Sequence, residues 1–266
     1  MISALILTTV MMVPGAQNAI NFTNVRLTYG ELGPVRQDAR YLPGDIFYIG
    51  FDIEGIKVED DGTVNYSLGV EVLDKDNMSI FKQDPIKQSG FLPLGGSKLP
   101  ARAFITIGIE QPPGKYTCKV TISDLATKAT KTLEQQFEVL KKDFGIVVVY
   151  SSADENGAHA VAPLGVAGQA INLHFGIVGF ARDPKTKRPS VSVQMTVIAK
   201  DGSATLQKPA VMTIEKEVNE RDTSIPMRML LPMNRVGDFT LELKATDQIS
   251  KATTTIKYPI KVLSAN

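Results

Sequence analysis

The chain has 266 residues, of which 29 are Lys or Arg and 28 are Asp or Glu, so its formal net charge is +1. This balance gives no case for nucleic acid as a partner, because nucleic-acid-binding domains carry a clear basic excess. The length is long for one domain and comfortable for two. Residues 20–140 carry a net charge of −3 and residues 141–266 a net charge of +4.

Residues 1–19 have the pattern of a secretory signal peptide. Residues 2–13 are uncharged and mostly apolar, and they are too short to span a bilayer comfortably. Ala19 would be the last residue before cleavage. No Lys or Arg precedes the apolar run, so the alternative is an ordinary first element of a folded domain. We predict an exported protein, periplasmic, cell-surface or secreted, with no transmembrane anchor in the mature chain.

After Ala19 the apolar residues of the first half recur with a period of two, which is typical of β-strands. Residues 42–45 (LPGD) predict a turn, because Pro fixes φ and Gly accepts positive φ. Residues 85–100 are rich in Gly, Pro and Ser, and we expect a loop there. Strands are predicted at residues 20–27 (with one irregularity), 46–53, 64–73, 80–81 and 101–109.

The strongest signal is an internal repeat near the end of each half. Residues 114–140 and 237–263 align without a gap, 123 positions apart, and nine of the 27 positions are identical. Ordinary composition gives roughly one or two identities by chance. Asp124 and Asp247 recur in the turn of this block, where Asp commonly accepts backbone N–H bonds. A binding loop is the alternative interpretation of these two residues.

The second half retraces the first, and no segment shows a sustained helical period. Its strands are predicted at residues 146–150, 171–177, 190–199 and 229–231, followed by the repeated block. Short strands with regular turn signals are typical of β-sandwiches. We therefore predict an all-β chain of two tandem sandwiches of about seven strands each, with domains at residues 20–141 and 142–266.

Residues 113–117 (PGKYT) and 236–240 (VGDFT), each followed by an alternating strand, an Asp-containing turn and a long final strand, resemble the end of immunoglobulin-like domains in exported bacterial proteins. The turn at residues 42–46 (LPGDI) is similar to the strand-opening turn of such modules. The resemblance implies immunoglobulin-like sandwiches over most of the mature chain. It implies little about function, because such sandwiches serve adhesion, spacing, recognition and enzyme-accessory roles alike.

No motif in the sequence carries catalytic, cofactor-binding or metal-binding chemistry. The two histidines, His159 and His174, have no neighbouring Cys or acidic cluster at metal-ligand spacing. The single cysteine, Cys118, lies in an alternating apolar run, and its counterpart in the repeat is Leu241. A buried and inert thiol is expected there. We predict no catalytic residue, no cofactor and no metal.

One loop suggests a binding site. Arg182, Lys185, Lys187 and Arg188 cluster between the second and third strands of the second half, whereas residues 59–61 at the corresponding place in the first half are acidic. In an immunoglobulin-like sandwich the basic loop would lie near the domain junction and the acidic loop at the free tip. We hypothesise that these four cations contact an anionic partner, either the lower edge of the first domain or an external surface such as a wall polymer.

The sequence thus favours a non-enzymatic exported structural or protein-interaction protein. Its loops or exposed strand edges would contact a partner, an unknown protein or a cell-surface polymer. The alternative is an accessory module that binds glycans or a protein partner at the cell surface.

Overall fold

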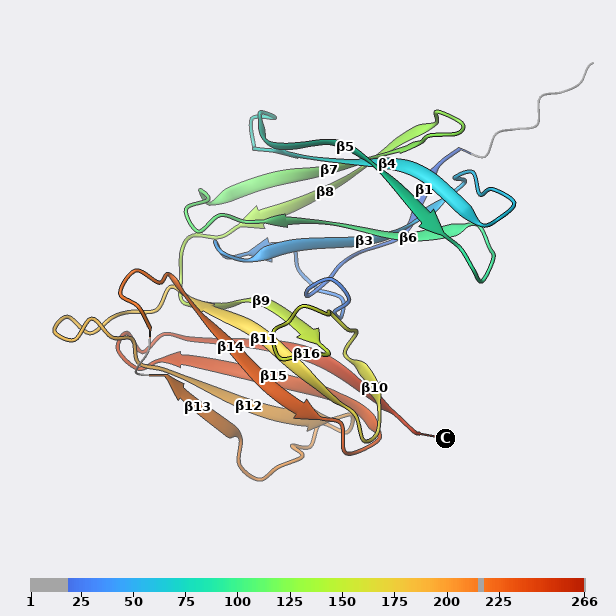
Figure 1. Cartoon of the computed structure of the whole chain (residues 1–266). Helices are drawn as coiled ribbons and strands as arrows, with labels where there is room; N and C mark the ends of the chain where they lie inside the picture. The colour runs from blue at the N-terminus through green and yellow to red at the C-terminus, as the bar shows by residue number, and fades with distance from the viewer. Residues whose placement is uncertain (1–18, 215–217, 266) are drawn as a thin grey trace, which may run out of the picture.

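The structure is a computed structural model that describes residues 19–214 and 218–265. The predicted signal peptide therefore lies outside the described residues, except for Ala19. All 16 regular elements of the described part are β-strands. They form two sandwiches, one above the other in Figure 1, and each sandwich packs a three-stranded sheet against a five-stranded sheet.

The first sandwich has the sheet orders β1-β3-β6 and β2-β8-β7-β4-β5. Strand β2 pairs with β8 in parallel, and the other neighbours are antiparallel. Its strands are β1 (Asn21–Leu27), β2 (Arg40–Tyr41), β3 (Ile46–Glu54), β4 (Thr63–Leu73), β5 (Ser79–Phe91), β6 (Lys98–Thr106), β7 (Gly114–Asp124) and β8 (Thr130–Val139).

The second sandwich repeats this topology, with the sheet orders β9-β11-β14 and β10-β16-β15-β12-β13. The predicted all-β fold of two tandem immunoglobulin-like sandwiches is confirmed. Each sandwich has eight strands, because the short parallel strands β2 and β10 add to the predicted strands, as does β13 in the second sandwich. The strands are β9 (Gly145–Ser152), β10 (Leu164–Val166), β11 (Ala170–Val178), β12 (Val191–Ala199), β13 (Ala210–Ile214), β14 (Ser224–Pro232), β15 (Gly237–Asp247) and β16 (Thr253–Leu263).

Buried apolar residues alternate with more exposed residues along the strands, and they form one apolar core in each sandwich. In the first, Phe47 and Ile49 of β3 face Cys118 and Val120 of β7, and all four are fully buried. Leu241 of β15 is equally buried at the position that matches Cys118. Burial of each large apolar side chain contributes about 1.5–3 kcal/mol, so the alternating pattern is enough to define which face of each sheet turns inward.

The expected loop at residues 85–100 is wrong. Strand β5 runs through Pro85 to Phe91, and β6 begins at Lys98. Because β5 is the edge strand of its sheet, the missing N–H of Pro85 costs little, and the β4–β5 register shifts at this point, between Leu68 and Val70. Proline in a sheet is confined to such edges and bulges, so its presence was not the loop signal that we took it for.

The first strand of each sandwich carries a bulge at an equivalent place. The register of β1 shifts between Thr23 and Arg26, and Asn24 there has a φ of 51°. In β9 the register shifts opposite His174 and Gly176, and Val148 has a φ of 53°. Asn tolerates this left-handed conformation, but a β-branched residue is strained in it. The second sandwich therefore holds Val148 in an unfavourable backbone conformation.

Candidate functional site

The predicted basic loop is a compact hairpin, which we call the basic hairpin (residues 182–189). Asp183 organises it: its Oδ1 accepts N–H bonds from Lys185 (2.9 Å) and Thr186 (2.7 Å), and its carbonyl accepts one from Lys187 (2.9 Å). These N–H donors, that of Thr186 first, lower the pKa of the Asp183 carboxyl. Lys187 has a φ of 58°, so the turn closes tightly and holds its side chains outward.

The same five-residue turn occurs three times in the chain. Residues 124–128 (DLATK), 183–187 (DPKTK) and 247–251 (DQISK) each begin with Asp and end with Lys. The terminal lysines Lys128, Lys187 and Lys251 have φ values of 64°, 58° and 65°. The internal repeat reveals the first and third copies, but not the second. The spacing of Asp, Thr or Ser, and Lys was the signal that could have revealed the second.

Arg182 has a different role from the other cations of the hairpin. Its guanidinium donates to the carbonyl oxygens of Lys187 (2.9 Å), Asn219 (2.8 Å) and Asp222 (2.9 Å). It also lies over the Phe180 ring, 5.1 Å from the centroid. Arg182 therefore fixes the hairpin to the segment before β14, and both of its terminal nitrogens donate within the fold.

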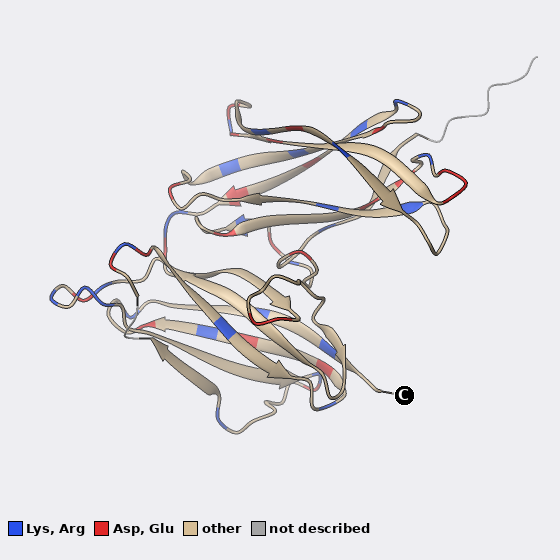
Figure 2. Cartoon of the chain, viewed as in Figure 1, with Lys and Arg blue, Asp and Glu red and all other residues tan. Residues whose placement is uncertain are grey.

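Lys185, Lys187 and Arg188 remain exposed. None of the three lies within ion-pair distance of an acidic group in the described residues. Figure 2 shows the hairpin as a protrusion on the left of the second sandwich, with the acidic loop at the opposite end of the first. The structure thus splits the four predicted residues into one framing arginine and three outward cations.

A pocket of about 300 Å³ lies between the two sandwiches, next to the basic hairpin. Pro43 and Ile109 of the first sandwich and Val178 and Phe180 of the second line it, and Arg182 lies in its wall. We call it the junction pocket. The basic hairpin is therefore near the domain junction, as the sequence analysis expected, but its three outward cations make no ion pair with the lower edge of the first sandwich within the described chain.

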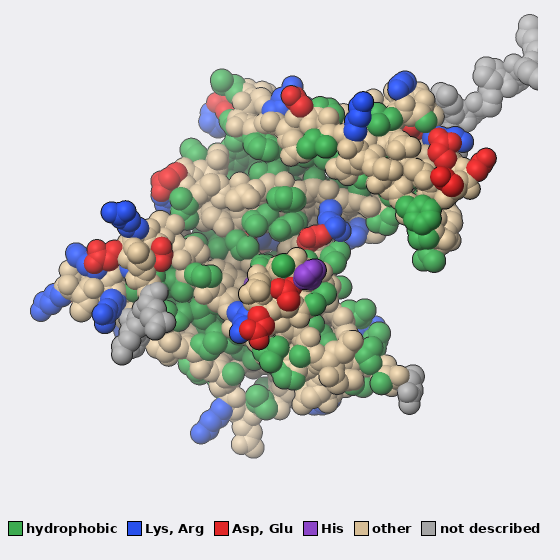
Figure 3. All heavy atoms as spheres, viewed as in Figure 1, with side chains coloured by type: hydrophobic (Ala, Val, Ile, Leu, Met, Phe, Trp, Pro, Cys, Tyr) green, Lys and Arg blue, Asp and Glu red, His purple; other side chains and the backbone are tan. Residues whose placement is uncertain are grey.

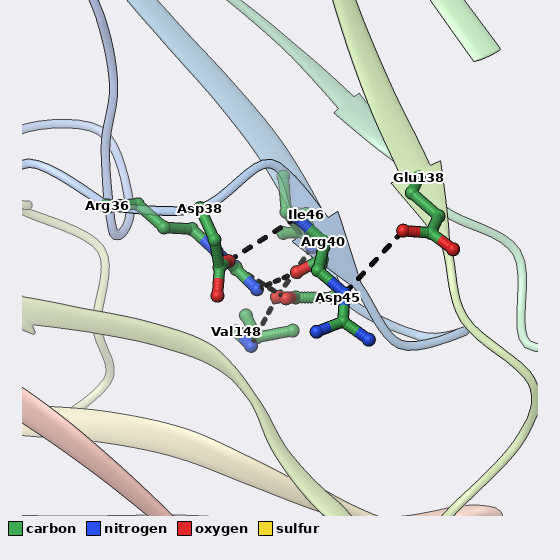
Figure 4. A network of polar contacts seen from close by, with 7 residues as sticks. All are labelled: Arg36, Asp38, Arg40, Asp45, Ile46, Glu138 and Val148. Atoms are coloured by element: carbon green, nitrogen blue, oxygen red, sulfur yellow. Dashed lines mark hydrogen bonds and ion pairs between the residues drawn. The ribbon is translucent and has the colours of Figure 1, made fainter. Parts of the chain in front are cut away.

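Behind this pocket, a buried polar network joins the sandwiches (Figure 4). Asp45 is 4% exposed; its Oδ2 binds Arg36 Nη1 at 2.8 Å, and its Oδ1 accepts the amides of Ile46 (2.9 Å) and Val148 (2.8 Å). The Arg36 guanidinium lies over the Tyr41 ring, 4.0 Å from its centroid. The Asp45 carboxylate of the first sandwich thus accepts a hydrogen bond from a backbone amide of the second.

Close apolar packing surrounds this network. The Gly145 backbone of β9 lies so near Leu42 that a Cβ at position 145 would collide with its side chain. Tyr29 of the first sandwich contacts Tyr258 of the second, with ring centroids 6.2 Å apart. Tyr258 Oη is in turn 3.0 Å from Ser151 Oγ. These contacts hold the two sandwiches in one relative orientation.

A serine–histidine pair in the second sandwich resembles part of a catalytic triad, but its hydrogen bonds have a different pattern. Ser152 Oγ is 2.7 Å from His174 Nε2, and it donates its proton to the carbonyl of Asp154 (2.6 Å). A hydroxyl has one proton, so the imidazole must donate and cannot act as a base toward Ser152. Ser152 is also fully buried. The pair positions β9 against β11, as expected for a satisfied strand histidine.

The open side of the first sandwich forms an apolar groove of about 470 Å³. The three-stranded sheet ends at β6, and the inward face of the edge strand β5 is only partly covered within the described chain. Phe81 and Ile86 on that face are 44% and 52% exposed. This groove was not predicted from the sequence, because much of β5 was expected to be a loop.

Among the described residues, no group of three or more His, Cys, Asp or Glu side chains could hold a metal ion. No helix in the same part of the chain is long and apolar enough to cross a membrane.

The sequence matches no protein-family model and no curated protein. Solved structures similar to the chain include the C-terminal domain of the antigen I/II polypeptide BspA of Streptococcus agalactiae, at 9% identity, covering 91% of this chain and 100% of that one with a TM-score of 0.30. Another is the C-terminal domain of the antigen I/II-family protein AspA of Streptococcus pyogenes, at 10% identity, covering 92% and 100% with a TM-score of 0.30. A likeness this distant carries no argument about the role of the chain.

Proposed function

We propose that the chain is a non-enzymatic exported protein whose two domains, residues 20–141 and 142–266, act as one tandem unit and contact an anionic partner through the basic hairpin. The observation that carries this proposal is the exposure of three cationic side chains, those of Lys185, Lys187 and Arg188. All three are exposed and free of ion pairs in the described chain, and Arg182 and Asp183 fix the turn that bears them. A frame built inside the fold to hold cations outward supports a binding role.

The hairpin fits an extended polyanion better than a single small ligand. Its cations lie on a protrusion, and exposed ion pairs contribute only about 0–1 kcal/mol each. Useful affinity then requires several charges of the partner to engage at once. A cell-surface polymer or an acidic protein face offers such an array, and its binding weakens as salt rises because exposed charges are screened.

The experiment measures binding of the mature protein to immobilised poly-glutamate and to wall polymer at low and high salt. We expect binding at low salt that is lost in the triple variant Lys185→Gln, Lys187→Gln, Arg188→Gln. The matched control, Lys115→Gln, Lys208→Gln, Lys244→Gln, removes three exposed charges elsewhere and should bind normally. Equal binding by both triple variants would contradict the proposal.

A second candidate is an accessory binding module for a protein segment, and the open groove beside β5 favours it. Unpaired edges and uncovered apolar faces accept extended peptides as added strands. Selection from a random peptide library should then enrich alternating apolar sequences, and Phe81→Asp should abolish their binding. A glycan array with no hits would exclude the glycan-binding form of this alternative.

A further inference from the structure

Methionines are distributed unevenly between the two sandwiches. Three of the nine methionines precede residue 19, and five of the remaining six lie in the second sandwich: Met195, Met212, Met227, Met229 and Met233. The sixth, Met78, is 66% exposed in the turn between β4 and β5. Among the described residues, the core of the first sandwich therefore contains no methionine.

The five methionines lie along one open edge of the second sandwich, and we call them the methionine edge. Here β13 and β14, which are the edge strands of their two sheets, lie side by side. Met195 and Met233 line a surface pocket of about 390 Å³, and Met212 and Met227 line a second pocket of about 380 Å³. Figure 3 shows apolar side chains reaching the surface on this side of the second sandwich. The thioethers are thus gathered where the sandwich is least closed.

The first sandwich provides an internal comparison for these positions. The bond from the Gly168 amide to the Met233 carbonyl (2.9 Å) repeats the bond from the Gly44 amide to the Ile107 carbonyl (3.0 Å). The strand registers align the other four in the same way, and the residues equivalent to the methionine edge are Val70, Ile86, Ala101, Ala103 and Ile107. Packing does not itself require methionine, because leucine fills a similar volume and has better defined rotamers. What methionine adds is a polarisable thioether sulfur.

Access to solvent is graded across the methionine edge. Met195 and Met212 are half-buried. Met227 and Met229 are 8% and 7% exposed, and Met233 is 2% exposed. Oxidation of a thioether requires contact with a dissolved oxidant, so susceptibility follows exposure. The outer pair would therefore meet an oxidant before the other three.

We infer that the methionine edge is an oxidation site, at which a peroxide converts Met195 and Met212 to sulfoxides and loosens the packing of β13 against β14. Hydrogen peroxide transfers one oxygen atom to the sulfur. The S–O bond forms as the O–O bond breaks, the sulfur loses two electrons, and the other oxygen leaves as water. A sulfoxide is polar, so its formation inside an apolar groove destabilises the packing there.

The loosened edge adjoins the anchor of the basic hairpin. Arg182 donates to the carbonyls of Asn219 (2.8 Å) and Asp222 (2.9 Å), in the segment before β14. Asp222 lines the same pocket as Met212 and Met227. Oxidation should therefore also release this anchor. Because oxidation of the edge needs no binding partner, its effect is measurable whether or not the hairpin binds a polyanion.

The order of oxidation is measured by peptide mass mapping of the folded mature protein after brief exposure to hydrogen peroxide. Met78 is the exposed standard. We expect Met195 and Met212 to react at rates within about tenfold of Met78, and Met229 and Met233 to react last. In denaturant all five should react alike. If Met195 and Met212 react no faster than Met233 in the folded protein, the assigned site is wrong.

Hydrogen exchange before and after oxidation locates the structural effect. The amides of β13 and β14, and that of Lys187 in the basic hairpin, should exchange at least about tenfold faster after oxidation, whereas those of β7 in the first sandwich should not change. Met195→Leu with Met212→Leu conserves volume and should abolish this response to peroxide. Met78→Leu is the matched control and should keep it. A response that persists in the double leucine variant, or unchanged exchange in the oxidised wild type, would overturn the inference.

Discussion

The backbone amide of Val148 in the second sandwich donates to Asp45 Oδ1 in the first, at 2.8 Å. The donor is available because the bulge in β9 turns this amide out of the sheet, at the cost of a φ of 53°. The acceptor is fixed because Arg36 holds the other carboxylate oxygen at 2.8 Å. A strained residue of one domain and a buried ion pair of the other thus meet in one hydrogen bond, which ties the orientation of the sandwiches to the stability of each.

Removing the charge of Asp45 should both destabilise the protein and loosen the junction. In Asp45→Asn, the guanidinium of Arg36 would lose its buried counter-charge and keep only the exposed Asp38 at 3.6 Å; breaking a buried pair on one side costs about 3–5 kcal/mol. We expect a loss near the lower end, because the side chain of Arg36 keeps 13% exposure. Chemical denaturation measures the stability, and small-angle scattering measures the spread of interdomain distances.

Asp38→Asn is the control for that change. Asp38 also faces Arg36, at 3.6 Å, but its side chain is 63% exposed. Removing the Asp38 charge should lower the free energy of unfolding by less than about 1 kcal/mol and leave the scattering curve unchanged. An equal effect of the two variants would show that the buried geometry of Asp45 has no special role.

Exchanging the residues of the two equivalent bulges should reveal the strain in β9. Val148→Asn places in the second sandwich the residue that the first one has at Asn24. Because the left-handed conformation costs a β-branched residue about 1–2 kcal/mol, we expect the variant to match or exceed the wild type in free energy of unfolding. Asn24→Val should destabilise by a similar amount. If Val148→Asn lost more than about 1 kcal/mol, packing of the valine side chain would outweigh the backbone strain.

The alternation of apolar residues was sufficient to predict the sheets, because inward positions such as Phe47 and Leu241 leave each strand one buried face. The role of Asp124 and Asp247 in their turns was also predictable, since Asp before a tight turn accepts nearby amides. What the sequence could not show is that each carboxylate reaches a second segment. Asp124 Oδ2 accepts the amide of Lys57 (2.8 Å), and Asp247 Oδ2 accepts that of Ala181 (2.8 Å).

The site was less predictable than the fold, because its contacts also join segments that are distant in the sequence. Four neighbouring cations in sequence suggested one surface, but only the tertiary structure shows that Arg182 points back to the carbonyls of Asn219 and Asp222. The junction pocket and the tie between Asp45 and Val148 join segments about 100 residues apart, and no local pattern encodes such a distance. Pro85 misled because its place at a sheet edge depends on strand order.

Each of the two buried turn aspartates, Asp124 and Asp247, should stabilise the fold only when its carboxyl group is ionised. Asp124 accepts the amides of Ala126 (2.8 Å), Thr127 (3.2 Å) and Lys57, and Asp247 has a matching set. Burial opposes the charged form of both, but the backbone donors outweigh it, so both carboxyl pKa values are lowered in the folded state. This stability is present above the unfolded pKa, near 3.8, and is lost as the pH falls through the lower folded value.

Asp124→Asn and Asp247→Asn should therefore each cost about 1–3 kcal/mol at neutral pH, because an amide nitrogen cannot accept the bonds that one carboxylate oxygen accepts. The difference from the wild type should shrink below pH 4. Denaturation at several pH values measures both effects. Asp84→Asn, at an exposed site on β5, should show no such trend. A cost that stays constant down to pH 2 would mean that shape, and not charge, is what these sites require.

The thiol of Cys118 should be silent in the native protein. It is fully buried between the sheets, and burial raises its pKa to about 12. At pH 8 only about one molecule in ten thousand would carry the reactive thiolate, and no path from solvent leads to it without opening the sandwich. A chromogenic disulfide reagent should therefore titrate no thiol in the folded protein and one per chain in denaturant.

Reaction of Cys118 in native buffer requires β7 to separate from its neighbours. The rate of labelling should therefore rise in Val120→Ala, which leaves a cavity beside the cysteine. Rapid labelling of the folded wild type would show that the first sandwich opens far more readily than its packing implies.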